Sequence, residues 1–155
     1  MYPKLSVKKG REYQILRGHP WLFSGGISQA PSKVAAGSLV DLIDINGGFI
    51  ARGYYNPQTD IAVRVLTKDP EQEIDSSFLR ARIEAAVQLR NQALDTAATD
   101  AYRLIHAEGD FLPGFVVDSY AGTLVVQSHT AGADGLLEMF VEALVDVAKP
   151  KSGRK

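Results

Sequence analysis

Cysteine is absent from the 155 residues of this chain. Its absence excludes a disulfide framework, a thiolate metal site and a cysteine nucleophile, and it fits a reducing cytosol. Long apolar runs are absent as well: none resembles a signal peptide, and none approaches the length that spans a membrane. We therefore expect a soluble cytoplasmic protein with no membrane partner.

Glycine-rich phosphate loops are also missing. The pairs Gly25-Gly26 and Gly47-Gly48 and the segment 132–135 match neither GxGxxG after a strand nor a Walker loop. Binding of a nucleotide or a methyl donor by this chain alone is therefore unsupported. We expect the chain to hold no cofactor.

Histidine is scarce, and His19, His106 and His129 lie in separate segments. They show no established metal-ligand spacing, so we expect no metal site. Glu108 and Asp110 follow His106 and could do general acid–base work as a small autonomous enzyme. Two acids on either side of a glycine are also ordinary turn chemistry, which we favour. No catalytic residue is assigned.

Hydrophobic and charged residues are present at the levels of a globular protein, 45% and 23%. Residues 1–67 carry eight basic and four acidic residues, whereas residues 68–155 carry nine and fourteen. The opposite net charges suggest two modules, of which the first could approach a polyanion. A merely solvated surface explains the charge alone about equally well.

Hydrophobic alternation predicts a small β-rich module in the first half. Strands are expected at residues 5–7, 38–45, 49–55 and 61–66. Asn46-Gly47 is a strong hairpin turn, because both residues tolerate positive φ. Residues 12–23 could hold a short helix that Gly18 and Pro20 interrupt. Short strands at this spacing suggest a small barrel or pseudobarrel, which we place at residues 1–74.

The second half mixes helices and strands. A polar connector at residues 68–75 marks the boundary, and Asp75 or Ser76 can cap a helix over residues 77–94. Apolar residues at helical spacing predict a second helix over residues 136–148, and apolar strands are expected at residues 102–106, 115–118 and 123–127. We expect an α+β protein whose residues 75–150 form a small α/β domain of two helices and a short, mainly antiparallel sheet. Residues 151–155 form a polar tail.

The segment 17–25 (RGHPWLFSG) holds the only Trp and follows a basic stretch. Cations for phosphates and a planar ring for a base are what a protein needs to bind a nucleic-acid strand. A core Trp that anchors a short helix to a sheet is the competing interpretation of Trp21, and we favour it because large aromatic side chains bury most of their area.

Three ordered blocks resemble the large-subunit ribosomal RNA cytosine-C5 methyltransferases: residues 17–25, residues 49–57 (FIARGYYNP) with the strand that follows, and residues 102–120 (YRLIHAEGDFLPGFVVDSY). The similarity covers nearly all of residues 3–150. It implies an N-terminal PUA domain at residues 1–74, the family's central domain at residues 75–150, and an S-adenosylmethionine-binding catalytic domain that is missing here.

The resemblance predicts a function for the basic module, which is to bind structured RNA, in particular large-subunit ribosomal RNA. The candidate RNA-binding residues are six cations at phosphates and two rings that stack or brace the surface: Lys8, Lys9, Arg11, Arg17, Arg52 and Arg64, with His19 and Trp21.

The chain departs from the family in having no Cys nucleophile and no donor loop, so we expect it to be non-catalytic by itself. An engineered truncation, a split gene or a frameshifted reading frame would each give such a sequence. The alternative is a structural or interaction fragment that docks on a separate catalytic domain or self-associates, for example as a homodimer.

Overall fold

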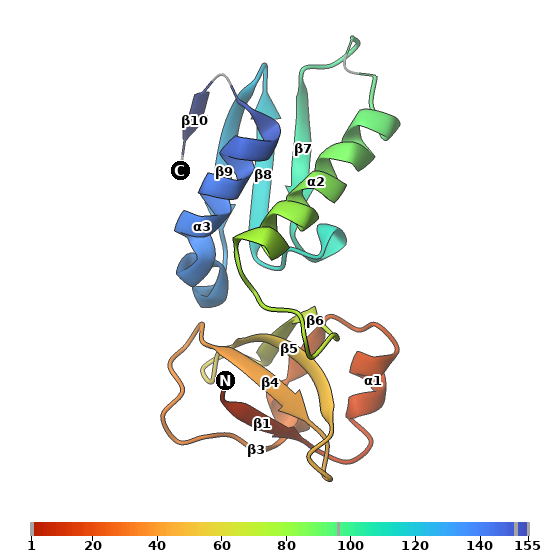
Figure 1. The fold of residues 1–155 in the computed structure, drawn as a ribbon, viewed down its shortest axis with the longest axis vertical. Helices are drawn as coiled ribbons and strands as arrows, with labels where there is room; N and C mark the ends of the chain where they lie inside the picture. Colours follow the sequence, from red (N-terminus) through yellow and green to blue (C-terminus); the bar gives the residue numbers. More distant parts are fainter. Residues whose placement is uncertain (1, 96, 151, 155) are drawn as a thin grey trace. The chain divides into compact units, whose positions relative to one another are not determined.

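The structure is a computed structural model that describes residues 2–95, 97–150 and 152–154. The chain divides into two compact units, Met1–Gln72 and Glu73–Lys155, and each contains its own sheet (Figure 1). The boundary expected from the sequence, after residue 74, lies two residues beyond this division. Each unit is described by itself.

The N-terminal unit is a curled six-stranded sheet in the order β2-β6-β5-β4-β1-β3. Its strands are β1 (Lys4–Val7), β2 (Trp21–Phe23), β3 (Ile27–Gln29), β4 (Leu39–Ile43), β5 (Phe49–Tyr55) and β6 (Ile61–Thr67). β1 and β4 are parallel, and the other neighbouring pairs are antiparallel. Between β1 and β2 lies the helix α1 (Glu12–Leu16), and the short turn η1 (Ser24–Gly26) joins β2 to β3. This confirms the expected β pseudobarrel.

The hairpin between β4 and β5 forms at the predicted Asn46-Gly47 turn, where Gly47 has a φ of 86°. Asp44 Oδ1 accepts hydrogen bonds from the backbone N–H groups of Asn46 and Gly48, each at 2.8 Å. This side chain begins the turn. β4 therefore ends at Ile43, two residues before the end of the predicted strand.

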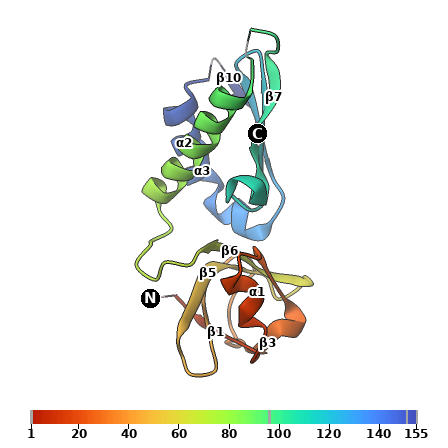
Figure 2. The same cartoon turned by 90° about the vertical axis from the view of Figure 1, so that its right-hand side faces the viewer.

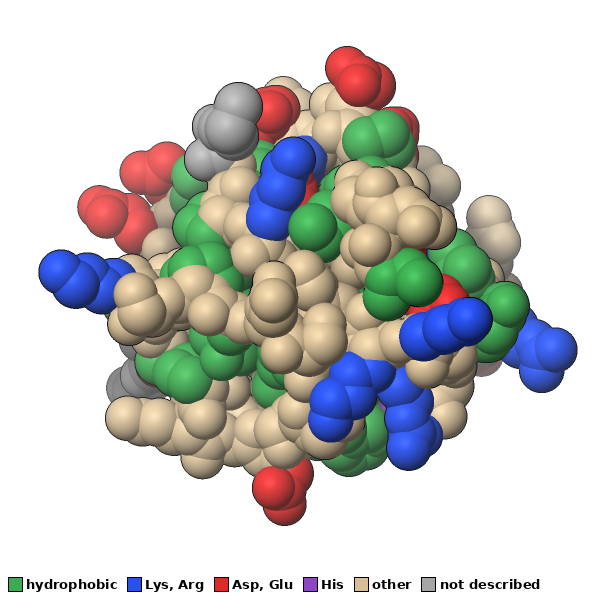
Figure 3. All heavy atoms as spheres, turned by 90° about the horizontal axis from the view of Figure 1, so that it is seen from below, with side chains coloured by type: hydrophobic (Ala, Val, Ile, Leu, Met, Phe, Trp, Pro, Cys, Tyr) green, Lys and Arg blue, Asp and Glu red, His purple; other side chains and the backbone are tan. Residues whose placement is uncertain are grey.

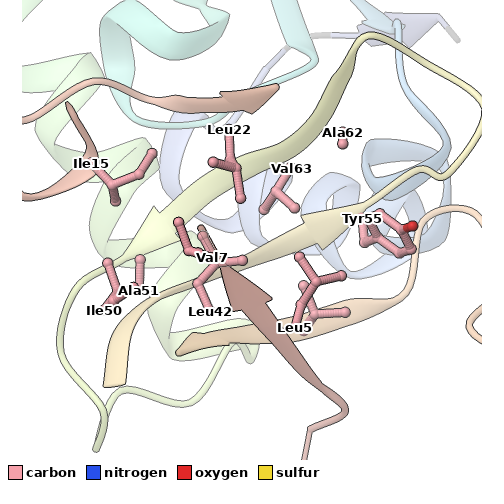
Figure 4. Packing of buried hydrophobic residues seen from close by; sticks show 11 residues of the cluster. Leu5, Val7, Ile15, Leu22, Leu42, Ile50, Ala51, Tyr55, Ala62 and Val63 are labelled. Carbon is pink, nitrogen blue, oxygen red and sulfur yellow. The ribbon is translucent and has the colours of Figure 1, made fainter. Parts of the chain in front are cut away.

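The core of the N-terminal unit lies inside the curled sheet, and α1 closes it with Ile15, which is fully buried (Figure 4). Along β1 and β4, alternate residues point inward because successive side chains of a strand face opposite sides. The inward set from the strands includes Leu5, Val7, Leu22, Val40, Leu42, Ile50 and Val63.

The C-terminal unit packs two helices on one face of a four-stranded sheet (Figure 2). The elements are α2 (Ser76–Ala93), β7 (Ala101–His106), η2 (Ala107–Asp110), β8 (Phe115–Tyr120), β9 (Thr123–Ser128), α3 (Ala131–Ala148) and β10 (Ser152–Arg154), with strand order β10-β9-β8-β7. Stacked rings of Phe115 and Phe140, with centroids 3.9 Å apart, join the sheet to α3. The expected α+β class, with a small second domain of two helices and a mainly antiparallel sheet, is confirmed.

The C-terminal segment differs from the expected polar tail. Residues 152–154 pair in parallel register with Thr123–Val125 of β9. An edge strand offers unpaired N–H and C=O groups, and backbone pairing with it requires no apolar side chain, so composition gave no signal for β10. The tail prediction for residues 151 and 155 lies outside the described residues.

Within the part of the chain that the structure describes, no helix is long and apolar enough to cross a membrane.

Candidate nucleic-acid interface

A basic turn, residues 8–11, joins β1 to α1 and is hydrogen-bonded to η1. Gly10, with a φ of 88°, turns the chain. The Lys8 backbone N–H donates to the Gly26 carbonyl at 2.8 Å, and the Lys8 ammonium donates to the Gly25 carbonyl, also at 2.8 Å. Arg11 closes the turn by donating its N–H to the Lys8 carbonyl at 2.9 Å. The turn therefore holds Lys9 and Arg11 on a fixed backbone, and both side chains are exposed.

An aromatic row follows α1. His19 precedes β2 and alternates with Trp21 and Phe23 of that strand, so the three side chains lie on one side of the chain. The ring centroids are 5.8 Å apart for His19 and Trp21, 6.2 Å for His19 and Phe23, and 6.3 Å for Trp21 and Phe23. The His19 ring is tied to Trp21, with Nδ1 3.0 Å from the backbone oxygen and 3.2 Å from the backbone nitrogen. We call His19, Trp21 and Phe23 the aromatic row.

Trp21 is not the core residue that the sequence interpretation favoured. Its side chain is only half-buried, whereas the next residue, Leu22, is 3% exposed and belongs to the core. Alternation explains the difference, because in a strand only one of two successive side chains can face the core. Phe23, at the end of the row, is 44% exposed.

A hollow of about 320 Å³ lies beside the aromatic row. Its lining combines cationic, amide, aromatic and backbone groups: Arg11, Gln14, His19, Leu22, Phe23, Gly25 and Gly26. A Cβ at Gly26 would come within 2.8 Å of Leu22 Cδ1, so a larger residue here would require the buried Leu22 side chain to shift. The volume is at the lower end of the range for small-molecule sites, so the hollow suits one ring-sized group.

Further basic residues lie around this region. Arg17 is exposed just after α1, and the Lys68 ammonium donates to the Leu16 carbonyl at the end of α1, at 3.2 Å. Arg64 is half-buried on β6, paired in register with Trp21. In Figure 3, basic side chains gather on one part of the face that the N-terminal unit presents, with few acidic side chains among them.

Arg52 corrects the sequence prediction of a phosphate contact. It is 5% exposed, and its Nε donates to Asp41 Oδ1 at 2.7 Å. Its remaining N–H groups donate to the carbonyl oxygens of Pro70 (3.2 Å) and Gln72. A guanidinium in this position supports the fold, and it lies below the surface on which a phosphate contact was expected.

The structure therefore brings Lys8, Lys9, Arg11, His19 and Trp21 into one region. Sequence reasoning missed Phe23, Gln14 and Lys68. For Phe23 the signal was present, because it continues the two-residue alternation from His19 through Trp21. Gln14 and Lys68 carried no such signal, since each joins this region only through folding.

Of the two acidic residues considered for acid–base chemistry, Glu108 and Asp110, the second is buried and has a structural role. Asp110 is 8% exposed and forms a two-point ion pair with Arg90, one arm of which measures 2.7 Å. It also accepts the backbone N–H of His106 at 2.6 Å. Asp110 thus holds its own turn together. Among the described residues, no three His, Cys, Asp or Glu side chains gather as metal ligands would.

Residues 5–68 match the family of the PUA-like domain, so the N-terminal unit is PUA-like. The chain is 38% identical over 144 residues to ribosomal RNA large subunit methyltransferase I of Klebsiella pneumoniae strain 342, and 39% identical to that of Shigella boydii serotype 4. These alignments cover 93% of this chain but 36% of each relative. The chain thus spans about a third of the length of these relatives.

Part of a solved structure from Streptococcus mutans, of a protein assigned as a SAM-dependent methyltransferase, has the same fold as this chain. It superimposes with a TM-score of 0.82 at 20% identity, over 96% of this chain and 38% of that chain.

Proposed function

We propose that this chain is the RNA-binding portion of a ribosomal RNA large subunit methyltransferase, and that its PUA-like unit holds structured RNA while methyl transfer takes place outside this chain. The single observation that carries the proposal is the aromatic row beside a rigid basic turn, with a hollow between them. The similarity to ribosomal RNA large subunit methyltransferase I supplies the class of RNA.

The chemistry of this region suits RNA. Lys9, Arg11 and Arg17 offer exposed cations for phosphates. Phe23 and His19 offer ring faces and edges, on which bases of any sequence can stack. Gln14, in the lining of the hollow, can donate and accept hydrogen bonds, as the edges of nucleobases require.

The methyl donor implied by the resemblance, S-adenosylmethionine, does not fit the residues described here. Cofactor folds of the Rossmann type use a parallel sheet with helices on both faces and a glycine-rich turn. The sheet of the C-terminal unit is mainly antiparallel, and both helices cover the same face. The hollow beside the aromatic row has no acidic side chain to hold a ribose. We therefore infer that S-adenosylmethionine binding lies in the part of the relatives that this chain does not span. The same part would carry the cytosine-C5 chemistry and its Cys nucleophile.

The test is RNA binding by the variant that combines Lys9→Gln, Arg11→Gln and Arg17→Gln. Fluorescence anisotropy with a large-subunit ribosomal RNA fragment, repeated over a series of salt concentrations, measures affinity and its salt dependence. Each lost phosphate contact lowers the slope of log K against log salt by roughly 0.7–0.9, so three should lower it by about 2 to 3. Weaker binding with a reduced slope is the expected result.

Lys33→Gln is the matched control, because Lys33 is exposed in the connection between β3 and β4 and does not line the hollow. Wild-type affinity that does not change with salt, or no binding to any ribosomal RNA fragment, contradicts the proposal. A self-associating species in sedimentation velocity, without RNA binding, would favour the interaction fragment instead.

A further inference from the structure

In the C-terminal unit, one arginine contacts two aromatic rings. Arg82 lies on α2, one helical turn after Phe78, and its guanidinium carbon is 5.3 Å from the centroid of the Phe78 ring. The same carbon is 5.1 Å from the ring centroid of Phe111, which follows η2. Phe78 is buried, whereas Phe111 is 65% exposed. The guanidinium therefore joins a core ring to an exposed ring.

The backbone of Phe111 has a strained left-handed conformation, and hydrogen bonds on both sides of the residue hold it in place. Its φ of 57° and ψ of 29° are left-handed, which is rare for a bulky residue. Its N–H donates to the Glu108 carbonyl at 3.1 Å, and the Leu112 N–H donates to the Ala107 carbonyl at 3.0 Å. The preceding residue, Asp110, is fixed by the ion pair with Arg90. Backbone strain of this kind, kept in place by its surroundings, is concentrated at functional sites.

Arg82 differs from the other arginines of α2. Arg80 is paired with Asp146 at 2.6 Å, and Arg90 is paired with Asp110. For Arg82, no acidic partner is found among the residues that the structure describes. Partial burial lowers its pKa, with no nearby carboxylate to oppose the shift. The N–H groups of a half-buried guanidinium that has no counter-charge are available to donate hydrogen bonds to an oxyanion.

We propose that Arg82 and Phe111 form a second RNA contact, which takes an unpaired nucleotide with its phosphate on the guanidinium and a base on the exposed ring. A nucleotide is the ligand that offers an oxyanion and a planar face within one residue. The base has to be unpaired, because paired bases in a helix are stacked on one another and their faces are closed. This inference rests on the RNA-binding function proposed above, but it concerns residues that the aromatic row and the basic turn do not include.

The test compares Arg82→Gln and Phe111→Ala in the full chain, with a single-stranded oligonucleotide and a duplex of the same length as probes. Loss of one stacked base or one phosphate contact should weaken binding of the single strand roughly tenfold. Duplex binding should stay the same. Phe111→Gly is a second ring-free variant that relieves the left-handed strain, so a loss of binding shared with Phe111→Ala reports the ring and not stability.

The control variants are matched in type and exposure. Arg80→Gln removes a charge from the same helix, but from a guanidinium already paired with Asp146. Tyr120→Ala removes an aromatic ring that is 51% exposed at the end of β8. Both should bind the single strand as the unaltered chain does.

The outcomes separate the two proposals. If the Arg82 and Phe111 variants keep full single-strand affinity while the triple variant at Lys9, Arg11 and Arg17 loses RNA binding, the second contact is overturned and the proposed function stands. If these variants change sedimentation and leave RNA affinity intact, the two side chains contact protein, which also overturns the proposal. If the unaltered chain binds no RNA, both proposals fail.

Discussion

At the scale of single residues, Arg52 shows how the same side chain can have opposite roles at the surface and in the core. Its guanidinium pairs with Asp41, lies 4.2 Å from the centroid of the Tyr2 ring, and donates to two carbonyl oxygens of the connector after β6. The sequence analysis placed it among the phosphate contacts because it is one of the cations of the basic N-terminal module. Sequence alone does not show whether an arginine faces solvent or is buried against partners. The partners of Arg52 include Asp41 and Gln72, which lie 11 and 20 residues away in the chain.

Replacing Arg52 should therefore lower stability. Arg52→Gln leaves the half-buried Asp41 carboxylate unpaired and removes donors from the Pro70 and Gln72 carbonyls. Removal of one partner from a buried ion pair costs about 3–5 kcal/mol. Urea unfolding followed by circular dichroism measures this loss, with Lys33→Gln as the surface control. A change in unfolding free energy within about 0.5 kcal/mol, the range of ordinary surface substitutions, would contradict the assigned role.

The aromatic row shows what alternation along a strand can and cannot predict. Alternation from His19 to Phe23 was visible in the sequence and fixes which residues share a face. It leaves open which of the two faces is buried, and residue type alone favours the large Trp ring for the core. The strand instead buries Leu22, because β2 lies beside β6 and its inward position meets the core.

At the scale of elements, both long helices begin at a side-chain cap. Asp75 Oδ1 accepts the Phe78 N–H at 2.9 Å, and Thr130 Oγ1 accepts the Ala133 N–H at 3.1 Å. Asp75→Ala and Thr130→Ala should each lower the free energy of unfolding by about 1 kcal/mol. Thermal and urea unfolding measure the effect. Ser77→Ala, in the exposed first turn of α2, is the control; equal losses in all three variants would show that these caps contribute nothing specific.

Elements with strong local signals were predicted well from the sequence. α2 begins within one residue of its predicted start, and β7, β8 and β9 were each found, because periodicity, caps and turn residues act over a few neighbouring positions. The three-residue strands β2, β3 and β10 were missed. Their pairing partners lie far along the chain, so their extended backbone is decided by hydrogen bonds that no local pattern records.

At the scale of the whole molecule, each unit has its own sheet and its own buried residues. We therefore expect residues 1–72 to fold alone and to keep the RNA contacts proposed for the basic turn and the aromatic row. Residues 1–68, which end where the PUA-like family match ends, should melt at a lower temperature, because Arg52 then lacks the Pro70 and Gln72 carbonyls. Thermal melts of the two fragments provide the comparison. Equal melting temperatures would show that the connector adds nothing to the first unit.

The hydrogen bonds from Arg52 to the connector after β6 have a consequence for how this segment can vary among relatives. Its acceptors there are carbonyl oxygens, which every amino acid possesses, so the contact does not depend on which side chains occupy residues 70 and 72. The number of residues between β6 and these carbonyls, by contrast, decides whether the oxygens reach the guanidinium. Substitutions in this segment should accumulate freely among relatives that keep the arginine, whereas single-residue insertions and deletions should be rare.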